Sequence, residues 1–173
     1  MEAYFYVLRF RQQYYRTNGN KGAYIVATNF SGGIYSQFGS DFPLWCNVYD
    51  SLGIEGVLSV SSTTNENYNV DEEGDLPSTC GSPYLIVATN TTIFDKKAPS
   101  AGFGKTHVDL GAPGSGTFSL NVNNEYNGFD GTSGSAPHVS ASIALIHSVP
   151  CGAFTDAIKT NPAETSLELR KAI

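Results

Sequence analysis

The chain has 173 residues, of which 40% are hydrophobic and 15% charged, enough apolar material for one folded domain. Its formal net charge of -6 argues against binding to nucleic acid or to an anionic membrane surface. The longest apolar runs are too short to span a bilayer. Residues 1–4 also lack the basic stretch followed by an apolar run that opens a signal peptide.

Helical and strand-like patterns alternate along the chain, which predicts a parallel sheet covered by helices. In chain order we expect a helix at 4–15, a strand at 23–28, a helix at 42–52 with Gly53 as its C-cap, and a strand at 56–62. A polar loop at 63–83 precedes strands at 84–89 and 107–110 and a helix at 133–147. A last helix is expected after Asn161, with Pro162 in its first position.

Three cysteines, Cys46, Cys80 and Cys151, form no Cys-x-x-Cys pair and therefore fit no common metal spacing. Two interpretations remain open. In a secreted protein, Cys46 could pair with Cys80 and leave one buried thiol. Alternatively, all three are small buried hydrophobic residues.

The strongest chemical signal is Ser133, within the run GTSGSAPHV at residues 131–139. A serine hydroxyl becomes a nucleophile when a base takes its proton and nearby donors stabilise the resulting oxyanion. A serine in the first turn of a helix lies next to unpaired N–H groups and a partial positive charge. Gly131 permits a sharp turn into that helix, and Pro137 is expected early in it, where a missing N–H costs little.

This run resembles the nucleophile motif of the subtilases, the subtilisin-like serine proteases, Gly-Thr-Ser-x-x-x-Pro-His-Val. Residues 109–114, DLGAPG, resemble the Asp-x-x-Ala-Pro-Gly segment that precedes the nucleophile in that family. Residues 57–65 are similar to the strand ending in Ala-Gly-Asn, residues 25–33 to the strand ending in Asn-Met-Ser-Leu-Gly, and residues 76–88 to the Tyr-Pro-Ala segment with its following strand. The resemblance covers nearly the whole chain and implies a three-layer α/β/α fold with a mostly parallel sheet.

The resemblance also implies roles for individual residues. Ser133 would be the nucleophile, and Asn65 would donate its side-chain amide to the oxyanion. Ser31, Gly32 and Gly33 would bind substrate, because in the family this backbone pairs with the peptide as an added strand.

Asn29 competes with Asn65 for the oxyanion role, because it also ends a strand-like segment. If Asn29 took that role, the peptide-binding segment would have no strand left to follow, so Asn65 is preferred. Thr64 departs from the family, which usually has glycine at this position.

The aspartate and histidine of the subtilase triad lie in Asp-[Thr/Ser]-Gly and His-Gly-[Thr/His] contexts, and neither occurs here. We expect His138 to be structural, His107 to begin a strand, and His147 to interact with a helix end. The sequence thus predicts a single partial catalytic domain over residues 1–173, incomplete at the N-terminus and ending at Ile173 inside a helix, and inactive by itself.

The expected function is that of a serine endopeptidase acting on peptide or protein substrates. The alternatives are a non-catalytic peptide-binding module and an inactive fragment. The family implies secretion, and a monomer is expected for the complete enzyme. Calcium is a family cofactor that the acidic residues 71–75 could bind, but solvated charge explains them better, and no metal ligand is assigned.

Overall fold

The computed structural model describes residues 1–173 and is built around a four-stranded sheet. Its strands, in spatial order, are β1 (Ala27–Phe30), β3 (Leu58–Ser62), β5 (Leu85–Thr91) and β6 (Leu110–Pro113). All three neighbouring pairs are parallel. Because the spatial order follows the chain order, β1 and β6 form the two edges of this sheet.

Both faces of the sheet are buried, as the side chains of β5 illustrate. Ile86 and Ala88 belong to one hydrophobic cluster, and Leu85 and Val87 belong to a second one. This alternation follows the two-residue period of a strand. Burial on both faces explains why β5 begins with a continuous apolar run, Leu-Ile-Val-Ala at residues 85–88.

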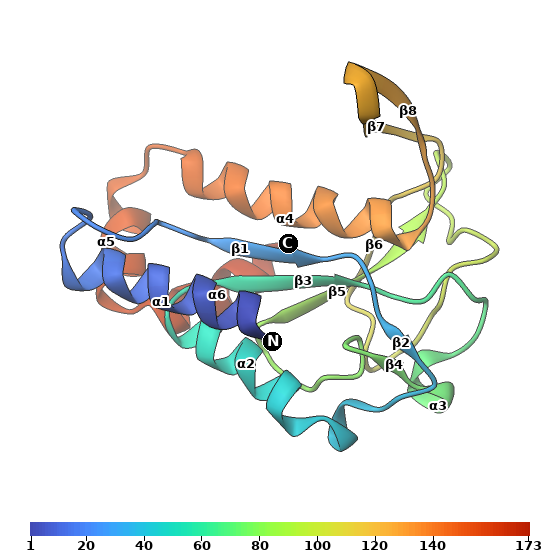
Figure 1. Cartoon of the computed structure of the whole chain (residues 1–173), viewed down its shortest axis with the longest axis horizontal. Helices are drawn as coiled ribbons and strands as arrows, with labels where there is room; N and C mark the ends of the chain where they lie inside the picture. The colour runs from blue at the N-terminus through green and yellow to red at the C-terminus, as the bar shows by residue number, and fades with distance from the viewer.

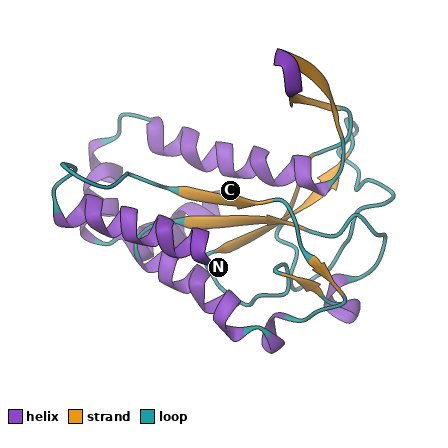
Figure 2. Ribbon diagram, viewed as in Figure 1, coloured by secondary structure: helices purple, strands orange, loops and turns teal.

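Helices form a layer on each side of the sheet (Figures 1 and 2). The long helix α4 (Thr132–Ser148) runs along one face, and α1 (Glu2–Arg16) and α2 (Pro43–Ile54) lie on the other. The helices α5 (Gly152–Thr160) and α6 (Pro162–Ala172) pack against each other near the amino ends of the strands. The predicted three-layer α/β/α fold is confirmed.

Smaller elements decorate this core. A two-stranded antiparallel pair joins β2 (Ile34–Tyr35) to β4 (Asp75–Leu76). Short helical turns are η1 (Gly39–Asp41) and α3 (Val70–Glu73). A hairpin of β7 (Thr117–Asn121) and β8 (Glu125–Phe129), with the turn η2 (Val122–Asn124), stands away from the body (Figure 1).

A disulfide joins Cys46 in α2 to Cys80, which follows β4, and confirms that predicted pair. Cys151 is a free, exposed cysteine, so the expectation of a buried thiol is wrong.

No single helix is long and apolar enough to cross a membrane. Only α4 and α5 taken together, with a bend of 109° between them, meet those criteria.

Several predicted boundaries were wrong for tertiary reasons. Gly53 does not cap α2, which continues to Ile54. The structure gives this glycine a different reason, because a side chain at position 53 would collide with the ring of Tyr84. The strand expected at 107–110 begins only at Leu110. The polar loop at 63–83 contains α3 and β4, and the hairpin and α5 were not predicted.

Candidate active site

The predicted site residues lie at the carboxyl edge of the parallel sheet, where ligands commonly bind in α/β folds. Ser31 follows the end of β1, and Asn65 follows the end of β3. Ser133 is the second residue of α4, which begins at the same edge. The fold therefore brings together three residues that are far apart in the sequence.

The entry to α4 is a tight turn that requires glycine. Gly131 has a φ of 112°, in the region that side chains rarely adopt. A Cβ atom at this position would also lie 2.9 Å from Oδ1 of Asn65. The backbone N–H of Gly131 donates to the carbonyl oxygen of Gly114 at 2.9 Å, which ties the turn to the end of β6.

The side chain of Asn65 is oriented by Thr132. Its Oδ1 accepts a hydrogen bond from the backbone N–H of Thr132 at 2.9 Å. The hydroxyl of Thr132 donates to the carbonyl oxygen of Thr63 at 2.6 Å. With its oxygen held in this way, Asn65 keeps its amide nitrogen without an acceptor, and the backbone N–H of Ser133 has none either.

Ser133 and Ser31 contact each other twice. The hydroxyl of Ser133 donates to the carbonyl oxygen of Ser31 at 3.4 Å, and the hydroxyl of Ser31 donates to the carbonyl oxygen of Ser133 at 2.9 Å. That carbonyl is available because Pro137, four residues later, has no N–H to donate. Pro137 lies early in α4, as predicted, but in the second turn, where its missing N–H removes one helical hydrogen bond.

The segment from Ser31 to Gly33 leaves edge strand β1 with its backbone N–H groups free of acceptors. Asn29, the rival for the oxyanion role, donates its side-chain amide to the hydroxyl of Ser31 at 2.9 Å. Its amide group is thus engaged with this segment, whereas that of Asn65 faces α4.

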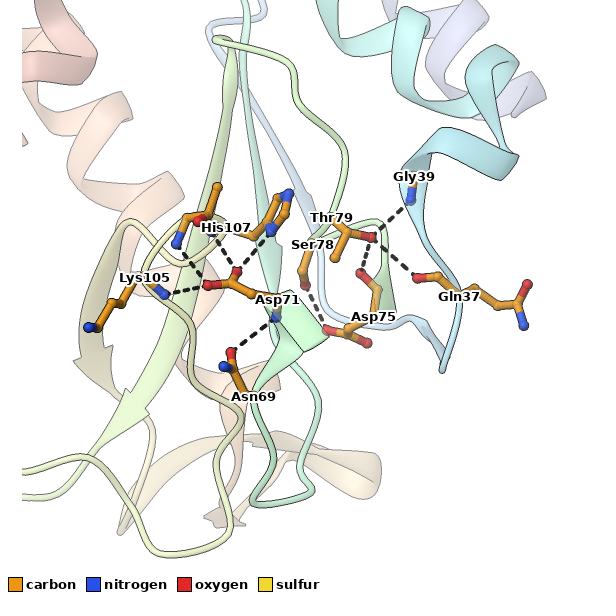
Figure 3. Close-up of polar contacts among 10 residues, drawn as sticks. Gln37, Gly39, Asn69, Asp71, Asp75, Ser78, Thr79, Lys105 and His107 are labelled. Carbon is orange, nitrogen blue, oxygen red and sulfur yellow. Dashed lines mark hydrogen bonds and ion pairs between the residues drawn. The ribbon is translucent and has the colours of Figure 1, made fainter. Parts of the chain in front are cut away.

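None of the three histidines contacts Ser133. His107 places Nδ1 2.8 Å from Oδ1 of Asp71, and the Asp71 carboxylate also accepts the backbone N–H groups of Lys105, Thr106 and His107 (Figure 3). Burial acts to raise the pKa of Asp71, but these hydrogen bonds outweigh it and hold the pKa below its ordinary value. His107 therefore anchors a loop before β6, and the expectation that it begins a strand is wrong.

The other two histidines are held within helical packing. His138 donates Nδ1–H to the carbonyl oxygen of Gly134 at 2.7 Å. His147 lies against the rings of Tyr24 and Phe154. Burial, and then the positive charge of Arg11, lower the pKa of His147 to about 4, so a favourable interaction of its cation with the helix end is the wrong interpretation.

The acidic segment is only partly solvated. Glu72 and Glu73 are exposed, but Asp71 is half-buried and Asp75 is 1% exposed, so the solvated-charge interpretation is wrong for the two aspartates. The structure holds no group of three or more His, Cys, Asp or Glu side chains placed to bind a metal ion. Burial raises the pKa of Asp75 to about 6, with a hydrogen bond from Ser78 acting in the opposite direction. Asp75 was not among the predicted site residues.

Solved structures with a similar fold include several proteases. A cold-adapted subtilisin-like serine proteinase aligns with a TM-score of 0.66 and 21% identity, over 95% of this chain and 52% of that one. The prenylagaramide maturation protease PagA aligns with a TM-score of 0.66 and 19% identity, over 95% of this chain and 54% of that one. These likenesses support the fold.

Sequence relatives and family membership point in the same direction. An extracellular protease of Xanthomonas campestris pv. campestris is 33% identical over 124 residues, which are 65% of this chain and 20% of that protein. Subtilisin-like protease 2 of Plasmodium falciparum is 29% identical over 99 residues, or 57% of this chain and 7% of that protein. The chain thus spans a fifth or less of these relatives and about half of the solved structures. Residues 12–159 match the Subtilase family, and the chain belongs to this family of serine peptidases.

Proposed function

We propose that this chain supplies the nucleophile, the oxyanion-binding groups and the peptide-binding segment of a serine endopeptidase. The observation that carries the proposal is the pair of free donors beside Ser133. The amide nitrogen of Asn65 and the backbone N–H of Ser133 both lack acceptors at the start of α4. Two donors next to a nucleophilic hydroxyl are what an acyl-transfer transition state requires.

In this proposal the hydroxyl oxygen of Ser133 attacks the carbonyl carbon of the scissile peptide bond. The negative charge that develops on the carbonyl oxygen is stabilised by the two free donors and by the N-terminus of α4. The proton of the Ser133 hydroxyl must pass to a base. Because none of the three histidines contacts Ser133, the base and its orienting carboxylate would come from a segment other than residues 1–173.

The same proposal assigns peptide binding to residues 31–33. Their backbone N–H groups are free and continue the edge strand β1. An extended peptide that added a strand here would pair through its main chain. Such pairing would present successive peptide carbonyls near Ser133, because Ser31 already contacts the backbone of Ser133.

A second candidate function is peptide binding without cleavage. It is favoured by the contacts of Ser133 itself, whose hydroxyl donates to the carbonyl oxygen of Ser31 and contacts no histidine.

We infer that the protein is secreted, whichever of the two functions it has. The disulfide between Cys46 and Cys80 fits an oxidising compartment, and one relative is named an extracellular protease.

A fluorophosphonate probe tests the catalytic proposal on the protein as its gene encodes it. Labelling should occur at Ser133, because only an activated hydroxyl reacts. Ser133→Ala should abolish labelling, and Ser142→Ala, an exposed serine of the same helix, should leave it unchanged. Absent labelling together with retained binding of extended peptides would support the second candidate instead.

The oxyanion assignment has its own test. Asn65→Asp keeps an oxygen that can accept from the N–H of Thr132 but removes the amide donor. We expect kcat to fall by about 10²- to 10³-fold with little change in KM. Full activity in this variant would contradict the role of Asn65.

A further inference from the structure

Asp75 is a buried carboxylate with only one of its oxygens satisfied. Its side chain is 1% exposed, and Oδ2 accepts a hydrogen bond from the hydroxyl of Ser78 at 2.7 Å (Figure 3). Oδ1 has no hydrogen-bond partner. No Lys, Arg or His of the chain forms an ion pair with Asp75, since the three ion pairs involve other residues.

The unsatisfied oxygen faces the peptide-binding segment. Asp75 opens β4, which pairs with β2 immediately after that segment, with Tyr35 opposite Asp75. A Cβ atom at Gly33 would lie 3.2 Å from Oδ1 of Asp75. On the other side, the backbone of Thr64 lies close enough to the carboxyl group to favour its ionised form. Asp75 is thus located between Gly33 and the residue that precedes Asn65.

An ionised carboxylate in this position is costly unless a cation accompanies it. Burying an unpaired charge costs several kcal/mol in real proteins. Burial accordingly raises the pKa of Asp75 to about 6, so the group is ionised and uncompensated at neutral pH. Residues 1–173 supply no cation for Asp75, and a cationic ligand would bring the compensating charge.

The proposed catalytic geometry indicates which part of a ligand reaches Asp75. Ser133 and Asn65 would hold the carbonyl of one substrate residue at the start of α4. To reach the carboxylate, the side chain of that residue would pass between residues 31–33 and residues 64–65, since Gly33 and the backbone of Thr64 both adjoin Asp75. Gly33 adds no side chain to this approach. Because Asp75 is 1% exposed, binding would require residues 31–33 to shift, and only a long side chain would reach the carboxylate.

We propose that Asp75 is a specificity-determining residue that selects lysine or arginine at the substrate position whose carbonyl Ser133 attacks. This inference rests on the proposed peptide site but not on catalytic activity, because selection of a cation is a binding property. The carboxylate would pair with the ammonium or guanidinium group in a water-poor environment, where such pairs are strong and their loss is costly.

The decisive experiment measures peptide binding to the Ser133→Ala variant of the encoded protein, by fluorescence anisotropy. The probes are labelled peptides of one sequence that end in Arg, Lys, Gln or Leu. We expect the Arg and Lys peptides to bind about 100-fold more tightly than the Gln and Leu peptides. Asp75→Asn in the same background should remove this difference and leave binding of the Leu peptide unchanged. If the protein also labels with the fluorophosphonate, kcat/KM for matched substrates should show the same preference.

Two controls separate selection from other effects. Glu72→Gln removes an exposed carboxylate three residues away and reports non-specific attraction of cations to a chain of net charge -6. It should retain the preference. Equal binding of all four peptides, or an equal loss of all four in Asp75→Asn, would overturn the inference. Absent fluorophosphonate labelling with a retained Arg preference would contradict only the catalytic proposal.

Discussion

Replacing Asp75 with asparagine should affect the stability of the folded chain more favourably at high pH than at low pH. The folded-state pKa of Asp75, about 6, lies above the ordinary value of 3.8. Between these two values the unfolded chain has released the proton while the folded chain still holds it. The free energy of unfolding therefore falls as pH rises through this window, and the loss levels off about one pH unit above the folded-state pKa.

The size of the effect follows from the two pKa values. At pH 8, ionisation of Asp75 costs the folded state about 3 kcal/mol, and at pH 4 only about 0.5 kcal/mol. Asparagine keeps an oxygen that can accept from Ser78 but buries an amide with no partner, a cost that does not depend on pH. The effect of the substitution should thus be more favourable at pH 8 than at pH 4 by about 2 to 3 kcal/mol.

Urea unfolding at both pH values, followed by circular dichroism, measures this double difference directly. Glu72→Gln, which removes one exposed negative charge from the same segment, reports the contribution of net charge alone. A double difference no larger than that of Glu72→Gln would show that Asp75 is not an uncompensated buried carboxylate. It would also remove the physical basis for its proposed selection of cations.

Two further predictions concern stability. Cys46→Ser should destabilise the fold by about 4 kcal/mol in chemical denaturation, because the lost disulfide closes a loop with a sequence separation of 34. Replacing the exposed cysteine, Cys151→Ser, should leave the free energy of unfolding unchanged. Equal effects of the two substitutions would contradict the disulfide. Gly53→Ala should lower the melting temperature although alanine favours helices, because its Cβ would lie 1.8 Å from an atom of the Tyr84 ring. Gly152→Ala, with nothing within 4 Å, is the matched control and should be neutral or stabilising.

The layered fold could be predicted because its elements carry strong patterns. The predicted bounds lie within two residues of the observed ones for the strands at 58–62 and 85–91 and for the helix at 132–148. The prediction that Gly53 caps a helix failed because the reason for this glycine is its contact with Tyr84, which is distant in sequence. The hairpin was missed although a signal existed. Phe118, Leu120 and Val122 alternate with polar residues before Asn123 and Asn124, which adopt φ values of 62° and 60°, as a tight hairpin turn requires.

Some residues of the candidate site could likewise be predicted from the sequence, and others could not. Ser133 and Asn65 could be located because local sequence motifs mark them, but the hydrogen bond that orients Asn65 depends on Thr132, 67 residues away. Asp75 carried no signal, because in the sequence it is one of four acidic residues in a polar stretch. Its position beside Gly33 follows from the pairing of β4 with β2, which no periodicity could predict over two residues.

The structure explains why the proposed oxyanion-binding groups can be held in place without the base. The start of α4 is held by three contacts that involve backbone atoms: Gly131 to Gly114, Thr132 to Thr63, and Ser31 to Ser133. Each contact comes from a segment that follows a different strand of the parallel sheet. Because none involves a histidine, the free donors beside Ser133 keep their geometry whether or not a base is present. Peptide binding and cation selection should therefore survive in Ser133→Ala, which is why they can be measured separately from proton transfer.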